Sequence, residues 1–503
     1  MIKLIYRIES DYMSKKRMLI VTSVTLSVVT ISLGIVKLYQ TYALSNYIGT
    51  VTDTGIDVYI NDDSYASIPA NGSSNVYYML TNTNPGTVKY GVAYQTTSGV
   101  TVKVYDTSED PATGTIEEND KKYIKLHLEN KNSTNKTIEL STVLGYENGG
   151  DLVVPSGVTL VTDTYTPPPT AAEYITKLYT TASKTTVTNN SITYNTAPSV
   201  SLMNDRLGGT TTDLDGGNIR YYGASPNNYI YFNCSDYSNQ TSSTCETWRI
   251  IGVFDGKLKL IRGSQIGTYS WDNKNTSTGA ESANGKNDWT TARLMKLLNP
   301  SDYYTVDSND NNLGQSLYYN STSGKCYSGQ NNATKDCDFT STGIKDTTRN
   351  MISETIWNIG GWNSNSVYSN QIYEYERGTT VYSGRPTTWK GKIALAYPSD
   401  YGYAADLNQC KDKTLYDYDN RTCTSNNWMK AIITNNGSNT GWLLTPHSGR
   451  SYFAWFVTSG GFVNYSYFAY FASGAVPVLS LSSELGIESG GDGSSSKPYK
   501  LSA

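Results

Sequence analysis

The chain has 503 residues, which is enough for about two or three domains. Charged residues make up 17% of the sequence and the formal net charge is −4, so no basic field favours a nucleic-acid partner. Tyrosine is heavily used, with 43 copies, while proline occurs only 15 times. This composition is typical of strands joined by polar loops, and we expect no nucleic acid among the partners.

An uncharged apolar segment lies near the N-terminus, at residues 18–36. At about 1.5 Å per residue it is long enough to span the hydrocarbon core of a bilayer. Three basic residues stand directly before it, at positions 15–17. The positive-inside rule therefore predicts a cytoplasmic segment over 1–17, a single-pass transmembrane anchor over 18–38 and an extracellular location for the bulk of the chain. A cleaved signal peptide is the alternative, although the apolar run is long for one.

Residues 47–165 carry short strand patterns separated by turn residues. Apolar and polar residues alternate at 55–61, 75–80, 101–105, 122–128 and 137–141. This pattern predicts an all-β immunoglobulin-like sandwich, which would serve as a stalk. The Cys–Trp–Cys core of antibody domains is missing, so the similarity is one of architecture.

A run of three prolines follows and predicts a stiff break. We expect a linker over 166–199 that contains one short amphipathic helix at Ala171–Thr181. Residues 200–503 then predict one large α+β domain, because strand patterns dominate and helices are few. Strands are expected at 229–233, 248–254 and 257–262, and helices at 287–298, 346–359 and 426–433.

The six cysteines fall into three pairs that are close in sequence: Cys234 with Cys245, Cys326 with Cys337, and Cys410 with Cys423. Each pair brackets a polar loop, which predicts three local disulfides and an oxidising compartment. Sequence proximity is the reason for this pairing. Free thiols or zinc ligands are the alternative, but the tight spacing common in zinc sites does not occur.

The segment 448–473 differs from the rest of the chain. Five of the eight phenylalanines lie in it, and it contains no lysine, aspartate or glutamate. Aromatic residues combined with serine and glycine are typical of antibody paratopes, so we predict a binding surface. The predicted ligand-binding residues are Arg450, Ser451, Tyr452, Phe453, Phe456, Thr458, Phe462, Asn464, Tyr465, Ser466, Tyr467, Phe468, Tyr470, Phe471 and Ser473. The alternative is a sheet core that carries aromatic residues on both faces.

Several segments, in this order along the chain, resemble a family of bacterial surface domains with a C-type-lectin-like, formylglycine-generating-enzyme-like fold. They are 248–252, 266–271, 294–300, 441–446 and the tail after Val476, and the likeness covers residues 219–501. The paired active-site cysteines of the formylglycine-generating enzymes are not matched, so the resemblance does not imply that activity. The family also usually has an arginine before the proline of its last core strand, where this chain has Ala475-Val476 before Pro477.

The same fold is found in the variable proteins of diversity-generating retroelements, in which adenines in asparagine codons are randomised near the C-terminus. Such changes give mainly Tyr, Phe, Ser, Ala, Thr and Asp, and the segment 448–473 uses a similar set. The resemblance implies that the predicted ligand-binding residues vary while a scaffold stays constant. The scaffold positions are Ala454, Trp455, Val457, Gly461, Val463 and Ala469.

We therefore expect a membrane-anchored cell-surface protein that binds a protein or glycan ligand, without enzymatic activity, cofactor or metal. One alternative is a structural or adhesin-like envelope protein with no variable site, and another is an extracellular glycan-acting hydrolase. A serine–histidine arrangement around His447 lacks the nucleophile elbow of hydrolases. The aspartate-rich segments 307–314 and 417–420 are expected to be solvated turns rather than calcium sites.

Overall fold

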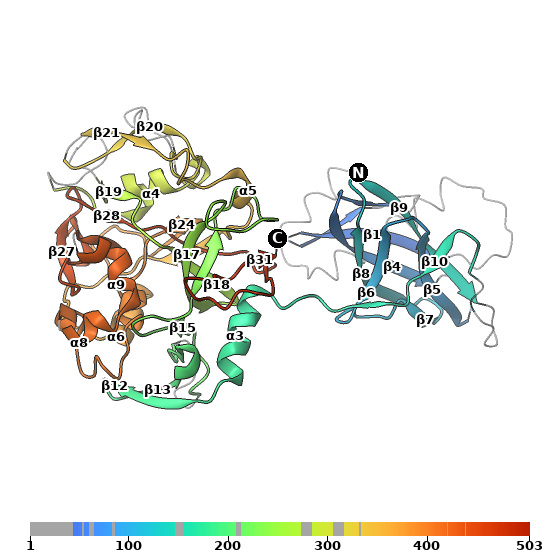
Figure 1. The fold of residues 1–503 in the computed structure, drawn as a ribbon, viewed down its shortest axis with the longest axis horizontal. Helices are drawn as coiled ribbons and strands as arrows, with labels where there is room; N and C mark the ends of the chain where they lie inside the picture. Colours follow the sequence, from blue (N-terminus) through green and yellow to red (C-terminus); the bar gives the residue numbers. More distant parts are fainter. Residues whose placement is uncertain are drawn as a thin grey trace. The chain divides into compact units, whose positions relative to one another are not determined.

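The chain forms two compact units, Met1–Pro167 and Pro168–Ala503, in a computed structural model (Figure 1). The structure describes residues 44–52, 55–59, 65–82, 86–145, 152, 154–207, 213–272, 284–304, 316–330, 333–419, 421–437 and 439–502. The predicted cytoplasmic segment 1–17 and anchor 18–38 lie outside these residues. Within them, no helix is both long and apolar enough to cross a bilayer.

The first unit is built from two β-sheets that share one hydrophobic core. Its strands are β1 (Leu44–Thr52), β2 (Gly55–Tyr59), β3 (Tyr65–Ile68), β4 (Gly72–Asn82), β5 (Val88–Gln95), β6 (Val100–Tyr105), β7 (Thr113–Ile116), β8 (Lys121–Asn130), β9 (Lys136–Gly145), β10 (Val158–Leu160) and β11 (Thr164–Tyr165). One sheet has the order β11-β6-β8-β4-β1-β2, and the other β10-β5-β9-β3 with β7 beside β5. Alternating residues of β4, β5, β8 and β9 fill the space between them, among them Tyr78, Val92, Leu126 and Ile138. An all-β unit in this region is therefore confirmed, and its assignment to the immunoglobulin type stays a prediction.

The second unit begins earlier than predicted. Helix α3 (Ala171–Thr181) starts after Thr170, whose hydroxyl accepts a hydrogen bond from the Glu173 N–H while the Glu173 carboxylate accepts one from the Thr170 N–H. Ile175 and Tyr179 of this helix are buried in the core of the second unit. The helix is confirmed.

The predicted linker over 166–199 is corrected, because much of it belongs to the second unit. After α3, strands β12 (Thr185–Asn189) and β13 (Ile192–Ala197) open a nine-stranded sheet. The residues of β12 are mostly polar and exposed, so the sequence pattern resembles that of a linker. Pairing with β13 holds this edge strand in the sheet, and its Val187 packs against a small cluster that contains Tyr194 and Tyr403.

Two larger sheets make up the second unit. The nine-stranded sheet has the order β12-β13-β14-β15-β17-β18-β29-β24 with β16 beside β17, and the five-stranded sheet has the order β19-β28-β25-β26-β27. Their further strands are β14 (Leu202–Asn204), β15 (Ile219–Tyr221), β16 (Tyr229–Phe232), β17 (Glu246–Phe254), β18 (Lys257–Arg262), β19 (Gly267–Ser270), β24 (Ile393–Ala394), β25 (Gly441–Pro446), β26 (Phe453–Val457), β27 (Val463–Phe468), β28 (Ala472–Ala475) and β29 (Val478–Ser480). One core joins both sheets and contains Ile250 and Leu260 of the larger sheet with Trp442 and Trp455 of the smaller one.

Short helices and hairpins surround these sheets. They are α4 (Arg293–Leu298), α5 (Asp346–Arg349), α6 (Ser369–Glu376), α7 (Pro398–Tyr403), α8 (Arg421–Ser425) and α9 (Trp428–Ile433), with the strand pairs β20 (Ser323–Tyr327) and β21 (Thr334–Asp338), β22 (Thr355–Asn358) and β23 (Thr388–Gly391), and β30 (Gly486–Ile487) and β31 (Leu501–Ser502). The predicted helix at 346–359 is wrong beyond its first turn. Residues Thr355–Asn358 form β22 because they pair with β23, which places Trp357 opposite Trp389. The prediction of a mostly β chain with few helices is confirmed.

Three disulfides link the cysteines in the predicted pairs. The Cα–Cα distances are 3.9 Å for Cys234–Cys245, 6.0 Å for Cys326–Cys337 and 5.0 Å for Cys410–Cys423. Each bridge closes a short loop of the second unit. Three disulfides suggest an extracellular or otherwise oxidising environment.

Candidate functional site

The predicted binding segment forms the hairpin of β26 and β27 and the start of β28. The two strands are antiparallel, with Phe453 opposite Phe468 and Val457 opposite Val463, and the register is irregular between Ala454 and Phe456. Gly461 closes the turn with a φ of 98°, a conformation that favours glycine. A Cβ atom on Gly461 would lie 2.5 Å from Cγ2 of Thr424, so the close approach of α8 also requires glycine there.

All six predicted scaffold positions are buried. The side chains of Ala454, Trp455, Val457, Val463 and Ala469 have no exposed surface. Trp455 also donates a hydrogen bond from Nε1 to the Trp362 carbonyl at 3.3 Å. These positions hold the hairpin on the core, so substitutions there act on folding first.

Seven aromatic side chains of the segment 448–473 are half-buried, and we call this set the aromatic face. Its members are Tyr452, Phe453, Phe462, Tyr465, Tyr467, Phe468 and Phe471. The ring of Phe468 lies 4.8 Å from that of Phe453, 5.6 Å from that of Tyr452 and 5.3 Å from that of Phe471, between centroids. Phe462 stands at the edge, where it contacts the exposed Tyr416.

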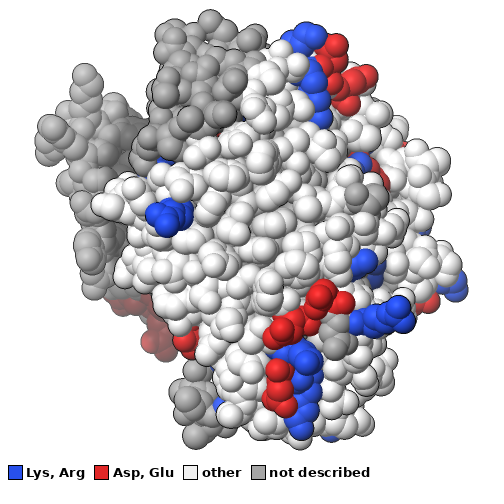
Figure 2. All heavy atoms as spheres, turned by 90° about the vertical axis from the view of Figure 1, so that its left-hand side faces the viewer, with Lys and Arg blue, Asp and Glu red and all other residues white. Residues whose placement is uncertain are grey.

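Few charges accompany the aromatic face. The side of the second unit on which β27 and β28 lie in Figure 1 faces the viewer in Figure 2, and its centre is almost free of charged side chains. Arg450 and Ser466 are exposed, and Thr458 and Asn464 are half-buried. An aromatic surface with few charges costs little free energy to desolvate when a partner covers it.

Four of the fifteen predicted ligand-binding residues are corrected because they are buried. They are Ser451, Phe456, Tyr470 and Ser473, with 6%, 6%, 9% and 1% of their surface exposed. Phe456 stacks beneath Tyr467 with ring centroids 4.4 Å apart. The Ser473 hydroxyl forms a hydrogen bond with that of Thr440, the residue before β25, at 2.7 Å. The other eleven residues keep part of their surface exposed.

A residue outside the predicted segment holds the loop before β26. Asn287 is buried, and its Nδ2 donates to the carbonyls of His447, Arg450 and Phe453 at 3.0, 2.8 and 2.8 Å. Nothing in the local sequence around Asn287 marks this role, because its three acceptors lie about 160 residues further along the chain.

His447 lies in the same loop and is buried. Its Nδ1 accepts a hydrogen bond from the Gly449 N–H at 2.8 Å, and its ring lies against those of Phe453 and Tyr465. Burial, reinforced by the positive charge of Arg450, lowers the pKa of His447 to about 4. The imidazole is therefore uncharged at neutral pH and supports the turn.

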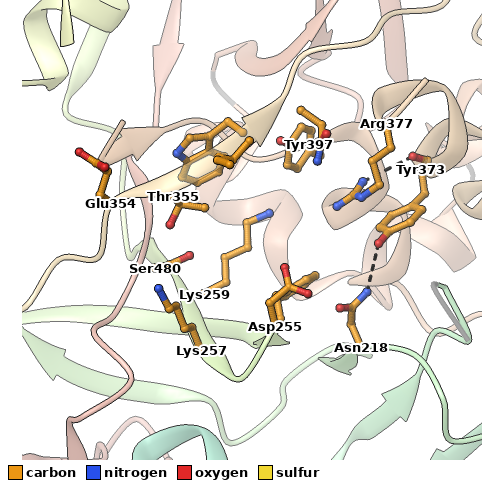
Figure 3. A pocket seen from close by; sticks show the side chains of 14 residues that line it. Asn218, Asp255, Lys257, Lys259, Glu354, Thr355, Tyr373, Arg377, Tyr397 and Ser480 are labelled. Carbon is orange, nitrogen blue, oxygen red and sulfur yellow. Dashed lines mark hydrogen bonds between the residues drawn. The ribbon is translucent and has the colours of Figure 1, made fainter. Parts of the chain in front are cut away.

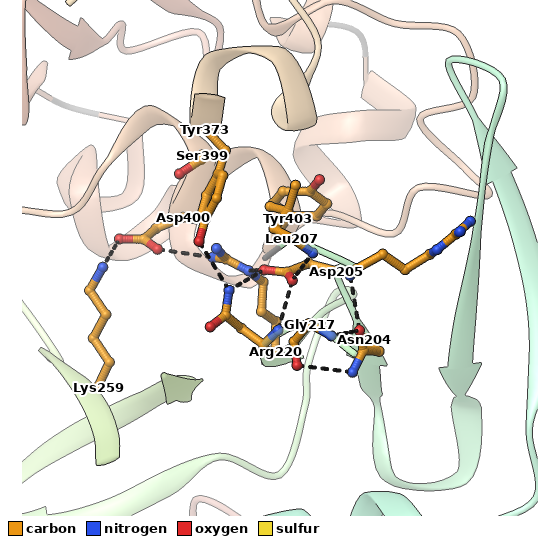
Figure 4. Close-up of polar contacts among 12 residues, drawn as sticks. Asn204, Asp205, Leu207, Gly217, Arg220, Lys259, Tyr373, Ser399, Asp400 and Tyr403 are labelled. Atoms are coloured by element: carbon orange, nitrogen blue, oxygen red, sulfur yellow. Dashed lines mark hydrogen bonds and ion pairs between the residues drawn. The ribbon is translucent and has the colours of Figure 1, made fainter. Parts of the chain in front are cut away.

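A separate pocket of about 390 Å³ lies where β17, β18, β22 and α6 meet (Figure 3). The aromatic rings of Trp357, Tyr373 and Tyr397 line it, together with Lys259 and Arg377. Its floor connects to a buried network of charges, which Figure 4 shows.

The charges of this network balance each other. Lys259 Nζ pairs with Oδ2 of Asp400 at 2.5 Å, Arg220 Nη1 pairs with Oδ1 of Asp400 at 2.9 Å, and Arg220 Nε pairs with Asp205. Burial opposes ionisation of Asp400, but Lys259 and Arg220 outweigh it and hold its pKa below the usual value. Burial lowers the pKa of Lys259 to about 8. Two cations therefore face two carboxylates, and the network is a structural core of the unit.

The pocket of about 390 Å³ also contains the carboxylate of Glu354, and a glycan hydrolase would need a carboxylic acid at such a place. The surroundings of Glu354, however, differ from those of a general acid. Glu354 pairs with Lys390, and the hydrogen bond from Lys390 lowers the pKa of Glu354. A glycosidase acid needs a raised pKa to stay protonated at neutral pH. Glu354 is instead ionised at neutral pH and forms an ion pair with Lys390.

No group of three or more His, Cys, Asp or Glu residues that could hold a metal ion occurs in the described part of the chain. The aspartate-rich segment 307–314 lies outside it. In the second such segment, Asp417 accepts a hydrogen bond from the Thr414 hydroxyl at 2.7 Å, as expected for a turn.

No protein-family model matches the chain, and no curated protein is similar to it. A solved structure, the envelope protein VP37 from White Spot Syndrome Virus, shares 14% identity over 20% of this chain and 98% of its own, with a TM-score of 0.12. A TM-score this low is no basis for inferring a shared fold.

Proposed function

We propose that this chain is a membrane-anchored cell-surface protein that binds a protein or glycan ligand through the aromatic face. The observation that carries the proposal is the separation of two sets of residues within one hairpin. Six scaffold positions are buried, while seven neighbouring aromatic side chains keep part of their surface exposed. Partly exposed aromatic clusters with few charges are typical of interaction sites, because each ring supplies a large contact area with few rotatable bonds.

The proposal extends to a fold of the C-type-lectin-like type and to diversification by a retroelement. Diversification is tolerated only if the residues that vary do not support the fold. Eight of the fifteen predicted positions meet this condition, since they retain exposed surface and are not among the residues packed against the core. Phe462, Tyr465 and Tyr467 are also partly exposed, but they pack against the core. The buried Phe456 and Tyr470 are the larger exceptions, and they would accept only residues that fill a similar space.

The proposed location rests on two features. The disulfides suggest an oxidising environment. The predicted anchor at 18–38, with basic residues before it, would then place both folded units outside the cell.

The test is a binding screen of the purified chain against arrays of glycans and of extracellular proteins. The triple variant Tyr452→Ser, Tyr465→Ser, Phe468→Ser removes three rings of the aromatic face. The control is Tyr65→Ser, which removes a 44% exposed aromatic ring from the first unit. We expect at least one molecule on the arrays to bind wild type and the control with equal affinity. Its affinity for the triple variant should be at least about tenfold lower. Equal binding by all three proteins would exclude the aromatic face as the site.

A further inference from the structure

A second pocket, of about 490 Å³, lies beside the β17 strand of the second unit, away from the residues of the aromatic face. Strands β16 and β17, the end of β18 and helix α9 contribute to its wall. Its polar and charged lining includes Glu246, Thr247, Arg249, Arg262, Ser264 and Asn436.

Arg249 is the unusual residue of this pocket. Only 6% of its surface is exposed. Its guanidinium lies between two aromatic rings, 3.7 Å from the ring centroid of Tyr229 and 4.8 Å from that of Trp428. Nε donates to Oδ1 of Asn228 and Nη2 donates to the Pro226 carbonyl at 3.3 Å. The guanidinium is thus held in one orientation by neutral groups.

No acidic side chain pairs with Arg249 among the residues that the structure describes. Other buried cations of this unit do have such partners: Arg220 pairs with Asp205 and Asp400, and Arg262 pairs with Glu246 through Nη2 at 3.0 Å and Nε at 3.1 Å. Burial accordingly lowers the pKa of Arg249 to about 10, and no carboxylate opposes the effect.

An uncompensated buried cation is costly, because desolvation of the charge is not offset by an ion pair. At the wall of this pocket Arg262 and Glu246 neutralise each other, which leaves the single positive charge of Arg249. A singly charged anion in the pocket would complete the missing pair. A planar carboxylate suits it best, because the guanidinium fork binds carboxylates through two parallel hydrogen bonds. A phosphate dianion would leave one negative charge in excess.

The rest of the lining indicates what else the anion carries. Thr247, Ser264 and Asn436 are exposed at the pocket and present hydroxyl and amide groups. The half-buried ring of Tyr229 and the exposed Ala431 add apolar surface. Hydroxyl and amide groups hydrogen-bond to sugar hydroxyls, while apolar surface packs on the C–H groups of a pyranose ring.

We propose that this pocket binds a sugar acid, a pyranose with one carboxylate, and that Arg249 pairs with the carboxylate. The ligand class covers both hexuronic acids and nonulosonic acids, since both place a carboxylate on the ring. The proposal uses none of the residues of the aromatic face, so it stands or falls independently of the function proposed above.

Isothermal titration of the full chain with four probes tests the proposal: glucuronic acid, N-acetylneuraminic acid, glucose and inorganic phosphate. We expect saturable binding of at least one sugar acid, at least about tenfold tighter than glucose or phosphate, and weaker at higher salt. The two acids distinguish between the two sugar types. Binding of neither acid, or binding of phosphate with equal affinity, would overturn the proposal.

Variants locate the site. Arg249→Lys keeps the positive charge but loses the planar fork, and Arg249→Gln loses both. Each variant should therefore bind the sugar acid at least about tenfold more weakly than wild type. Arg349→Gln removes an arginine that is not part of the pocket and should bind as wild type. If an Arg249 variant does not fold, the Nε–Hε resonance of Arg249 in the wild-type protein provides the measurement. It should shift on titration with the acid, and binding without such a shift would contradict the assignment.

Discussion

Phe453 and Phe468 lie opposite each other across the β26–β27 ladder, with ring centroids 4.8 Å apart and ring planes at 67°. Both side chains keep part of their surface exposed, whereas the neighbouring Ala454 and Trp455 are completely buried. Phe456 and Val457, which follow them in β26, are buried as well. The hairpin therefore combines a buried anchor with a partly exposed aromatic pair.

This arrangement predicts unequal effects on stability. Trp455→Ala should lower the free energy of unfolding by about 3–5 kcal/mol, because it leaves a large cavity in the core. Phe468→Ser should lower the free energy of unfolding by only about 1 kcal/mol, since the ring is partly solvated in the folded state. Urea denaturation followed by tryptophan fluorescence measures both, because all nine tryptophans belong to the second unit. Equal losses for the two variants would mean that the aromatic face is ordinary core, as in an envelope protein without a binding site.

The diversification proposal predicts where variation is tolerated. In a library with all fifteen predicted positions randomised, surface-displayed folded clones should vary freely at the eight partly exposed positions that do not pack against the core. Variation should be more restricted at Phe462, Tyr465 and Tyr467, which do pack against it. Phe456 and Tyr470 should stay large and apolar, because they are buried. Sequencing of sorted clones checks this, with randomised Trp455 as the control for an intolerant position.

The neighbouring DNA provides the independent test of diversification. It should contain a reverse transcriptase and a near-copy of the segment for 448–473 with adenines at the variable codons. A genome without such a repeat would refute diversification while leaving ligand binding untouched.

The protonation of His447 should respond to pH in a defined window. The folded pKa is about 4 against an ordinary value of 6.5, so unfolding takes up a proton between these values. The histidine should therefore have no effect on stability above about pH 6.5 and should reduce it progressively as the pH falls toward 4. NMR titration of the two imidazoles, assigned with His447→Gln, measures the pKa directly. Titration of His447 near 6.5 would show that the ring is solvated and that the loop before β26 is open.

The buried network predicts a large effect from one carboxylate. Asp400→Asn should lower the free energy of unfolding by about 3–5 kcal/mol, because Lys259 loses its partner and Arg220 keeps only Asp205. The matched control is Asp336→Asn, which breaks the exposed pair with Lys325 and should cost less than about 1 kcal/mol. Thermal unfolding compares the two, and similar shifts would mean that the network is not tightly desolvated.

The anchor prediction is tested on cells. The full chain should sediment with membranes and resist extraction by high salt, whereas a variant that lacks residues 18–38 should not. Protease added outside intact cells should remove the second unit while an N-terminal tag stays protected, since the positive-inside rule places the N-terminus in the cytoplasm. Soluble full-length protein would instead favour cleavage of the apolar segment.

The sequence alone predicted those features that depend on residues close to each other along the chain. Strand patterns predicted β4, β8, β17 and β18, an amphipathic pattern predicted α3, and short spacings predicted the disulfide pairs. The six scaffold positions of the hairpin were implied by the resemblance to variable proteins rather than by local physics, and all six are buried.

Only the tertiary structure decided the features that depend on partners far along the chain. Thr355–Asn358 is a strand because β23 pairs with it, and β12 belongs to a sheet because β13 does. Phe456 and Phe453 are both phenylalanines of one strand, yet Phe456 is buried beneath Tyr467 while Phe453 is not. Arg249 is distinguished because, within the described part of the chain, no carboxylate pairs with its buried guanidinium. Burial and charge compensation are sums over neighbours from the whole fold, and local sequence carries no record of those neighbours.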